Sequence, residues 1–143
     1  MMKKILATVF SLALSAPSFS AGQFDQSIEE MLERYNYTKD ITIVSVVLVR
    51  CAALLNITNS IQETPETVKV DPHKLFTSAI QMRSKNPGQA DVSTVIEEFR
   101  TNSKEYQDWF KTASEAAGNP FDSPALKKEF QICDESAREF LNI

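Results

Sequence analysis

The chain has 143 residues and a formal net charge of −4, from 15 Lys and Arg against 19 Asp and Glu. A chain of this length forms one domain and can bury roughly two thirds of its unfolded surface. A mildly acidic, scattered charge argues against nucleic acid or an anionic membrane surface as the partner. The chain has only three glycines, and none lies in a glycine-rich phosphate loop.

Residues 1–20 have the pattern of a secretory signal peptide. Two lysines precede the apolar stretch Ile5–Ala16, and Ser18 and Ser20 take the −3 and −1 places of a cut after Ser20. The short Met-Lys-Lys start is typical of bacteria. We therefore expect a periplasmic or secreted protein whose residues 21–143 form a single α-helical domain. That part keeps 13 Lys and Arg against 19 Asp and Glu, a net charge of −6.

The first helix of this domain is predicted to begin after an N-cap at Asp25. Its apolar residues recur at helical spacing, and they are Phe24, Ile28, Met31, Leu32 and Tyr35. Residues 35–40 are expected to form the turn into the next element.

The longest apolar run after the N-terminus is Ile41–Ile61. Five polar residues in and just after this run fall on one narrow helical stripe, and they are Thr42, Ser45, Asn56, Asn59 and Glu63. Val44, Val47, Leu48, Cys51, Leu54 and Leu55 lie on the opposite side. We expect a buried central helix that the other helices surround. A buried strand over residues 41–49 remains an alternative, because this half is rich in β-branched residues.

Arg50 lies at the centre of this run. Inserting it into a bilayer would cost about 2.5–3.5 kcal/mol, which disfavours a membrane span although the length suffices. Three interpretations stay open for Arg50. It reaches solvent from the edge of the buried face, it pairs with a carboxylate of a neighbouring helix, or it binds an anionic ligand.

Cap and proline signals place the later helices. Asp71-Pro72 and Ser123-Pro124 each combine an N-cap with proline at the first helical position. Asn86-Pro87-Gly88 is predicted to end the helix that begins at Pro72. Residues 91–118, with Asp91 as cap and Gly118 as C′ residue, form one helix or two, because the apolar stripe weakens at residues 101–103. The last helix is expected to carry Cys133 on its apolar face.

Cys51 and Cys133 are the only two cysteines. An even pair on two buried helix faces of an exported protein predicts a structural disulfide. Two free buried thiols and a redox-active pair are the alternatives. A redox-active pair would need a CxxC motif, which the sequence lacks. A metal site would need more His or Cys ligands than the chain has. We expect no metal and no cofactor.

Other residues that carry chemistry have plainer explanations. His73 is the only histidine and is expected at the surface. The acidic neighbours Glu97 and Glu98, like those at residues 29–33, are expected on solvated helix faces rather than as an acid–base pair. The densest aromatic group is Tyr106, Trp109, Phe110 and Phe121. Core packing explains this group, or part of it lines a groove.

The sequence therefore predicts an all-α fold, a single small helical bundle of four to six helices with one disulfide. The general plan, a signal peptide and a small helical domain with two distant cysteines joined, is similar to that of periplasmic acid-stress chaperones. No motif carries this likeness, so no residue role follows from it. We expect a non-catalytic binding or interaction protein of the bacterial envelope, with an acid-stress chaperone as the alternative and a hydrolase as the third class.

The partner is expected to be a protein or a small hydrophobic ligand. The residues predicted to form a ligand or partner surface are Arg50, Tyr106, Trp109 and Phe121.

Overall fold

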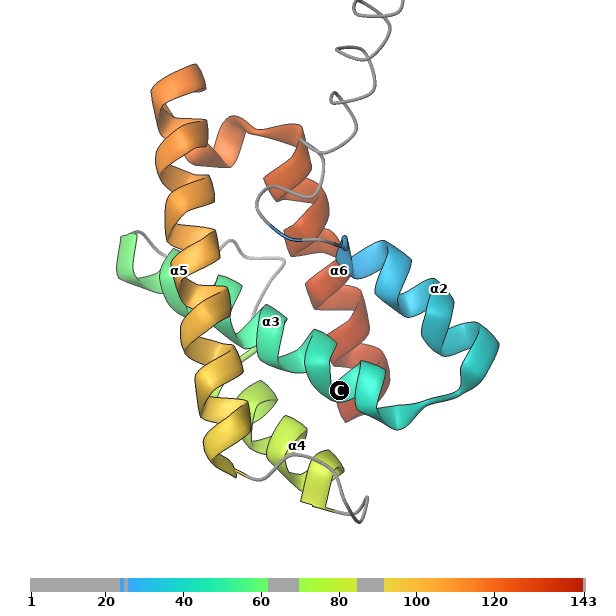
Figure 1. Cartoon of the computed structure of the whole chain (residues 1–143). Helices are drawn as coiled ribbons and strands as arrows, with labels where there is room; N and C mark the ends of the chain where they lie inside the picture. Colours follow the sequence, from blue (N-terminus) through green and yellow to red (C-terminus); the bar gives the residue numbers. More distant parts are fainter. Residues whose placement is uncertain (1–23, 25, 62–69, 85–91, 143) are drawn as a thin grey trace, which may run out of the picture.

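A computed structural model describes residues 24, 26–61, 70–84 and 92–142. Within these residues the secondary structure is helical (Figure 1). The elements are α2 (Ile28–Thr38), α3 (Ile41–Ile61), α4 (Pro72–Ser84), α5 (Val92–Ala117), the 3₁₀ helix η2 (Pro120–Asp122) and α6 (Pro124–Leu141). The all-α prediction is confirmed, and the alternative of a strand over residues 41–49 is wrong.

Helix α3 is the centre of the fold and contacts each of α2, α4, α5 and α6. It runs through the middle of the arrangement, with α5 crossing its C-terminal half and α6 beside its N-terminal half (Figure 1). The residues predicted for its apolar side are all buried, and they are Val44, Val47, Leu48, Cys51, Leu54 and Leu55. By length and composition Ile41–Ser60 would suffice to cross a membrane, but 78% of its most apolar window is buried inside the protein. Such burial fits the core helix that the sequence predicts.

The predicted polar stripe of α3 is correct only near its C-terminal end. Asn56 and Asn59 are exposed, whereas Ser45 is fully buried. Ser45 Oγ donates to the carbonyl oxygen of Ala79 at 3.1 Å and accepts from Arg83 Nε at 2.8 Å. A polar side chain with two such bonds can be buried at little cost. Glu63, the last residue of the predicted stripe, lies outside the described residues.

The start of α2 differs from the prediction. Ser27, not Asp25, is the N-cap, and its Oγ accepts from the backbone N–H of Glu30 at 3.1 Å. The helix continues to Thr38, so residues 35–38 are not a turn. The chain reverses at Lys39, which has a φ of 59° and is the C-cap. Asp25 itself lies outside the described residues.

The predicted starts of α4 and α6 are confirmed. Asp71 Oδ1 accepts from the backbone N–H of His73 at 3.0 Å, and Ser123 Oγ accepts from that of Leu126 at 3.4 Å. Both helices begin at the predicted prolines. The predicted turn at residues 86–88 and the cap at Asp91 lie outside the described residues.

The sequence left open whether residues 91–118 form one helix or two. Val92–Ala117 is one continuous helix, and the polar residues 101–103 are part of it. Thr101 is exposed, and its two successors are half-buried, so these positions need no apolar side chain. Gly118 follows with a φ of 83°, and its N–H donates to the carbonyl of Ser114 at 2.7 Å. This is the left-handed C′ residue predicted for the end of the helix.

Candidate functional site

Cys51 and Cys133 form a disulfide that joins α3 to α6. Their Cα atoms are 5.5 Å apart, and 82 residues separate them in the sequence. Both are 1% exposed. The predicted structural disulfide is therefore confirmed, and the two helices touch where their apolar faces meet.

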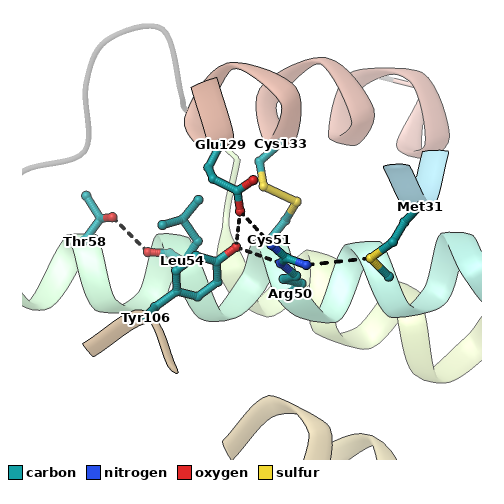
Figure 2. The surroundings of a disulfide bond; sticks show 8 residues. All are labelled: Met31, Arg50, Cys51, Leu54, Thr58, Tyr106, Glu129 and Cys133. Carbon is teal, nitrogen blue, oxygen red and sulfur yellow. Dashed lines mark hydrogen bonds and ion pairs between the residues drawn. A yellow bond between two sulfur atoms is a disulfide. The ribbon is translucent and has the colours of Figure 1, made fainter. Parts of the chain in front are cut away.

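A buried polar cluster surrounds Arg50, one residue before the disulfide (Figure 2). Its Nη2 donates to Glu129 Oε1 of α6 at 3.2 Å, and its Nε donates to Tyr106 Oη of α5 at 3.1 Å. Tyr106 Oη in turn donates to Glu129 Oε1 at 2.7 Å. Arg50 Nη1 donates to the carbonyl oxygen of Gln26 and lies 3.7 Å from Met31 Sδ. We call Arg50, Glu129 and Tyr106 the Arg50 cluster.

Aromatic rings cover the same cation. The Arg50 guanidinium carbon lies 3.7 Å from the centroid of the Phe24 ring, within the range of a cation–π contact. Phe24 also packs against Tyr106, with centroids 4.8 Å apart. Trp109 is stacked on Tyr106 at 6.0 Å. Arg50 is thus satisfied inside the fold, and of its three predicted interpretations the ion pair with a neighbouring helix is the one observed.

The buried environment of the cluster clearly shifts the pKa of Tyr106. Complete burial raises the pKa of its phenol well above the ordinary value, and the negative charge of Glu129 raises it further, against an opposing effect of Arg50. The hydroxyl therefore stays protonated and remains a donor to Glu129. Its role in the cluster is to bridge the two charged groups.

A second buried arginine was not singled out from the sequence. Arg83 of α4 is buried and donates from Nη2 to Glu98 Oε1 of α5 at 2.6 Å, with a second bond from Nη1 to Glu98 Oε2. Its Nε reaches Ser45 of α3. The bidentate pair joins α4 to α5, and the bond to Ser45 adds α3. The prediction of a solvated face is therefore wrong for Glu98, although it holds for Glu97, which is exposed.

The residues predicted as a ligand or partner surface are mostly internal. Arg50, Tyr106 and Trp109 are buried, so they present no outer surface in this conformation. Phe121 is half-buried and packs on Phe110, with centroids 5.5 Å apart. A ligand role for these four residues stays a prediction, and the first three would need the helices to move. His73 is exposed, as expected.

The outer surface is hollowed where α3 and α5 cross. One hollow of about 390 Å³ lies between Ile57 and Ser60 of α3 and Gln107, Phe110 and Lys111 of α5. This hollow adjoins another of about 540 Å³, because Ile57 and Gln107 line both.

The larger hollow continues along α5 past Lys104, Ser103 and Arg100. A third hollow of about 260 Å³ shares Asn56 and Phe99 with it and reaches the start of α4. The three form one surface depression, which we call the α3–α5 groove. The sequence did not reveal it, because its walls come from separate helices whose crossing no local pattern specifies, as with Ile57 of α3 and Gln107 of α5.

Another hollow, of about 160 Å³, lies between the start of α2 and α6, and Glu129 is among its lining residues. Lys128 and Glu29 form an exposed ion pair of 3.1 Å on the same hollow. Glu129 thus bonds Arg50 on one side and borders this hollow on the other. In the described part of the chain, no group of three or more His, Cys, Asp or Glu side chains has a metal-binding arrangement.

Comparison with protein-family models, with curated proteins and with solved structures finds no match to this chain.

Proposed function

We propose that this protein is a small exported, non-catalytic binding protein of the bacterial envelope, and that its α3–α5 groove is the binding surface. The observation that carries the proposal is the groove itself. It places the exposed polar side chains of Gln107 and Lys111 around a floor formed by the buried side chains of Ile57 and Phe110. A mixture of apolar contacts and placed polar groups is what recognition surfaces use.

The internal charges support a binding role rather than catalysis. Glu98 is bound to Arg83, and Glu129 is bound to Arg50 and Tyr106. Glu97 is exposed and lies in a surface pair with Arg100. Two of these carboxylates are thus engaged by arginines, and the third lies at the surface.

Export is supported by two features of different kinds. The first is the signal-peptide pattern of residues 1–20. The second is the buried disulfide, since disulfides persist mainly in oxidising compartments such as the periplasm. Intact mass of the protein from the envelope fraction would test both, with cleavage after Ser20 and a mass about 2 Da below that of the dithiol as the expected result.

Site-specific photo-crosslinking in the intact bacterial cell tests the binding surface. A photoreactive residue at Gln107, in the groove, is expected to give a discrete adduct. The same residue at Gln131, exposed on α6, is the matched control and is expected to give none. Equal labelling from both positions, or a hydrolase activity that is lost on Glu97→Gln or Glu98→Gln, would overturn the proposed function.

A second candidate, an acid-stress chaperone, is favoured by the two buried arginines that are paired with glutamates, Arg50 with Glu129 and Arg83 with Glu98. Protonating Glu129 leaves the Arg50 guanidinium buried without a counter-charge, and protonating Glu98 does the same for Arg83. Such uncompensated burial is strongly destabilising. The groups that face Glu129 are Arg50 and Tyr106, with the Lys128–Glu29 pair on the adjoining hollow. Acid would thus loosen α6 and expose apolar surface of α3.

Acid titration separates this candidate from a protein that binds in its native state. A chaperone of this kind would bind a hydrophobic dye and suppress aggregation of a client protein at low pH. The variant Glu129→Gln would bind the dye already at neutral pH. Native Trp109 fluorescence that persists at about pH 2–3, below ordinary carboxyl pKa values, would refute the chaperone.

A further inference from the structure

We propose that the α3–α5 groove binds an extended, acidic segment of a partner protein, with apolar side chains between its acidic ones. This inference rests on the proposed function and names the chemistry of the partner. It follows from the charge, the composition and the length of the groove.

The groove is basic although the chain is acidic. Arg100, Lys104 and Lys111 contribute three positive charges to the walls of the three hollows, and Asp108 contributes the one negative charge. The chain as a whole has a net charge of −4. Local charge opposite to the overall charge favours the approach of an anionic segment to this surface.

The basic residues share one stripe of α5. Steps of four and three residues connect them, with Gln107 between Lys104 and Lys111, so they project along the same side of the helix. Arg100 and Lys104 are 71% and 74% exposed at the side chain. Their bonds to Glu97 and Asp108 are exposed pairs within one helix turn, which exchange readily for another carboxylate. Lys111 is exposed and has no ion pair within the described residues.

The remaining lining suits a polypeptide. The half-buried rings of Phe76 and Phe99 offer apolar contacts, and the buried Ile57 and Phe110 form the floor. Asn56 and Gln107 carry side-chain amides, which both donate and accept hydrogen bonds as a peptide backbone requires. Ser103 Oγ is buried beside the groove and has no hydrogen-bond partner in the described part of the chain.

The length of the basic stripe sets the length of the ligand. From Arg100 to Lys111 the helix advances eleven residues, or about 16 Å at 1.5 Å per residue. An extended chain covers that distance with about five residues. Carboxylates on every second residue would face the wall of α5, and the apolar residues between them would face the floor.

Peptide binding to the purified oxidised protein tests the assignment. The probe is a fluorescein-labelled hexapeptide of alternating Asp and Val, compared by fluorescence anisotropy with the same peptide carrying Asn in place of Asp. The acidic peptide is expected to bind about tenfold more tightly, equivalent to about 1.4 kcal/mol. The preference should shrink as salt is raised.

Two double variants locate the binding. Lys104→Gln with Lys111→Gln is expected to abolish the preference for the acidic peptide. Lys127→Gln with Lys128→Gln removes the same charge from the exposed side of α6 and is expected to leave it unchanged. All four positions are exposed, and circular dichroism with Trp109 fluorescence verifies that both variants are folded.

The alternative outcomes are distinct. Equal affinity for both peptides, together with a cross-link at Gln107 in cells, would overturn the acidic assignment and leave the proposed function standing. No peptide binding and no cross-link at Gln107 would overturn both. Self-association that disappears in the Lys104→Gln, Lys111→Gln variant would assign the groove to a second copy of the chain. Tighter binding of a single-stranded oligonucleotide than of the acidic peptide would also overturn the inference.

Discussion

Two ion pairs of equal length in this protein differ greatly in burial, and they predict very different effects of the same substitution. Arg50 and Glu129 are 3.2 Å apart, with side chains 4% and 5% exposed. Arg100 and Glu97 are also 3.2 Å apart, with side chains 71% and 68% exposed. Glutamine in place of either glutamate keeps the shape and removes the charge.

The expected magnitudes follow from the surroundings of each pair. At 3.2 Å, Coulomb's law gives about 1.3 kcal/mol at a dielectric constant of about 80 and about 5 kcal/mol at an effective value of about 20. Breaking a buried pair by removing one partner typically costs about 3–5 kcal/mol, because the other charge stays buried. We therefore expect Glu129→Gln to lower the free energy of unfolding by about 3–5 kcal/mol. Glu97→Gln should lower it by about 0–1 kcal/mol.

Urea denaturation at neutral pH measures both values. Trp109 is the only tryptophan and lies in the core beside Tyr106, so its fluorescence reports unfolding of the region that holds the cluster. Coincidence with the circular dichroism transition would justify a two-state analysis. If Glu129→Gln costs no more than Glu97→Gln, Arg50 is effectively solvated and the reasoning from burial is refuted.

Three further predictions follow from single contacts. Replacing Cys51 and Cys133 by Ala should lower the free energy of unfolding by about 2–4 kcal/mol, against an upper value of about 4.5 for a loop of 82 residues. An unchanged urea midpoint would contradict this. Because burial raises the pKa of Tyr106, the folded protein keeps a proton that the unfolded chain loses above about pH 10. The contribution of Tyr106 to the free energy of unfolding is complete below that pH. Above that pH, the free energy of unfolding declines by up to about 1.4 kcal/mol per pH unit. Tyr106→Phe should remove this alkaline slope, and an equal slope in both proteins would disprove its origin. Ser27→Ala should cost about 1 kcal/mol through the lost cap of α2, whereas Ser27→Gly should cost only a few tenths. Equal thermal stability of the two variants would argue against the cap.

Sequence periodicity predicted the elements of this fold because each is defined by neighbours in the chain. The apolar run Ile41–Ile61 became the central helix with its bounds intact. The Asp71-Pro72 and Ser123-Pro124 signals placed two helix starts, since a cap and a proline act within one turn. The error at the start of α2, where Ser27 caps in place of Asp25, is a choice between two good caps only two residues apart.

What periodicity could not supply is the identity of long-range polar partners. Glu129 is 79 residues from Arg50, and Arg83 is 38 residues from Ser45. Periodicity places Ser45 on the polar stripe of the central helix because it is polar and lies in register with Asn56. The burial of Ser45 is compensated by the Arg83 guanidinium and the Ala79 carbonyl of α4, and no local pattern encodes these partners. The same limit explains why the sequence did not reveal the groove.

The two polar clusters and the groove divide α3 into parts with different roles. Arg83 meets Ser45 near the start of the helix, and Glu129 and Cys133 meet Arg50 and Cys51 near its middle. These contacts hold α4 and α6 on the N-terminal half. Asn56, Ile57 and Ser60, beyond Cys51, line the groove with α5. The buried arginines are paired with glutamates inside the fold. The basic residues of the α5 stripe lie at the surface, where a ligand can reach them. The sites that stabilise the fold and the site proposed for binding are thus separate along one helix, so Lys104→Gln and Lys111→Gln should alter recognition without altering stability.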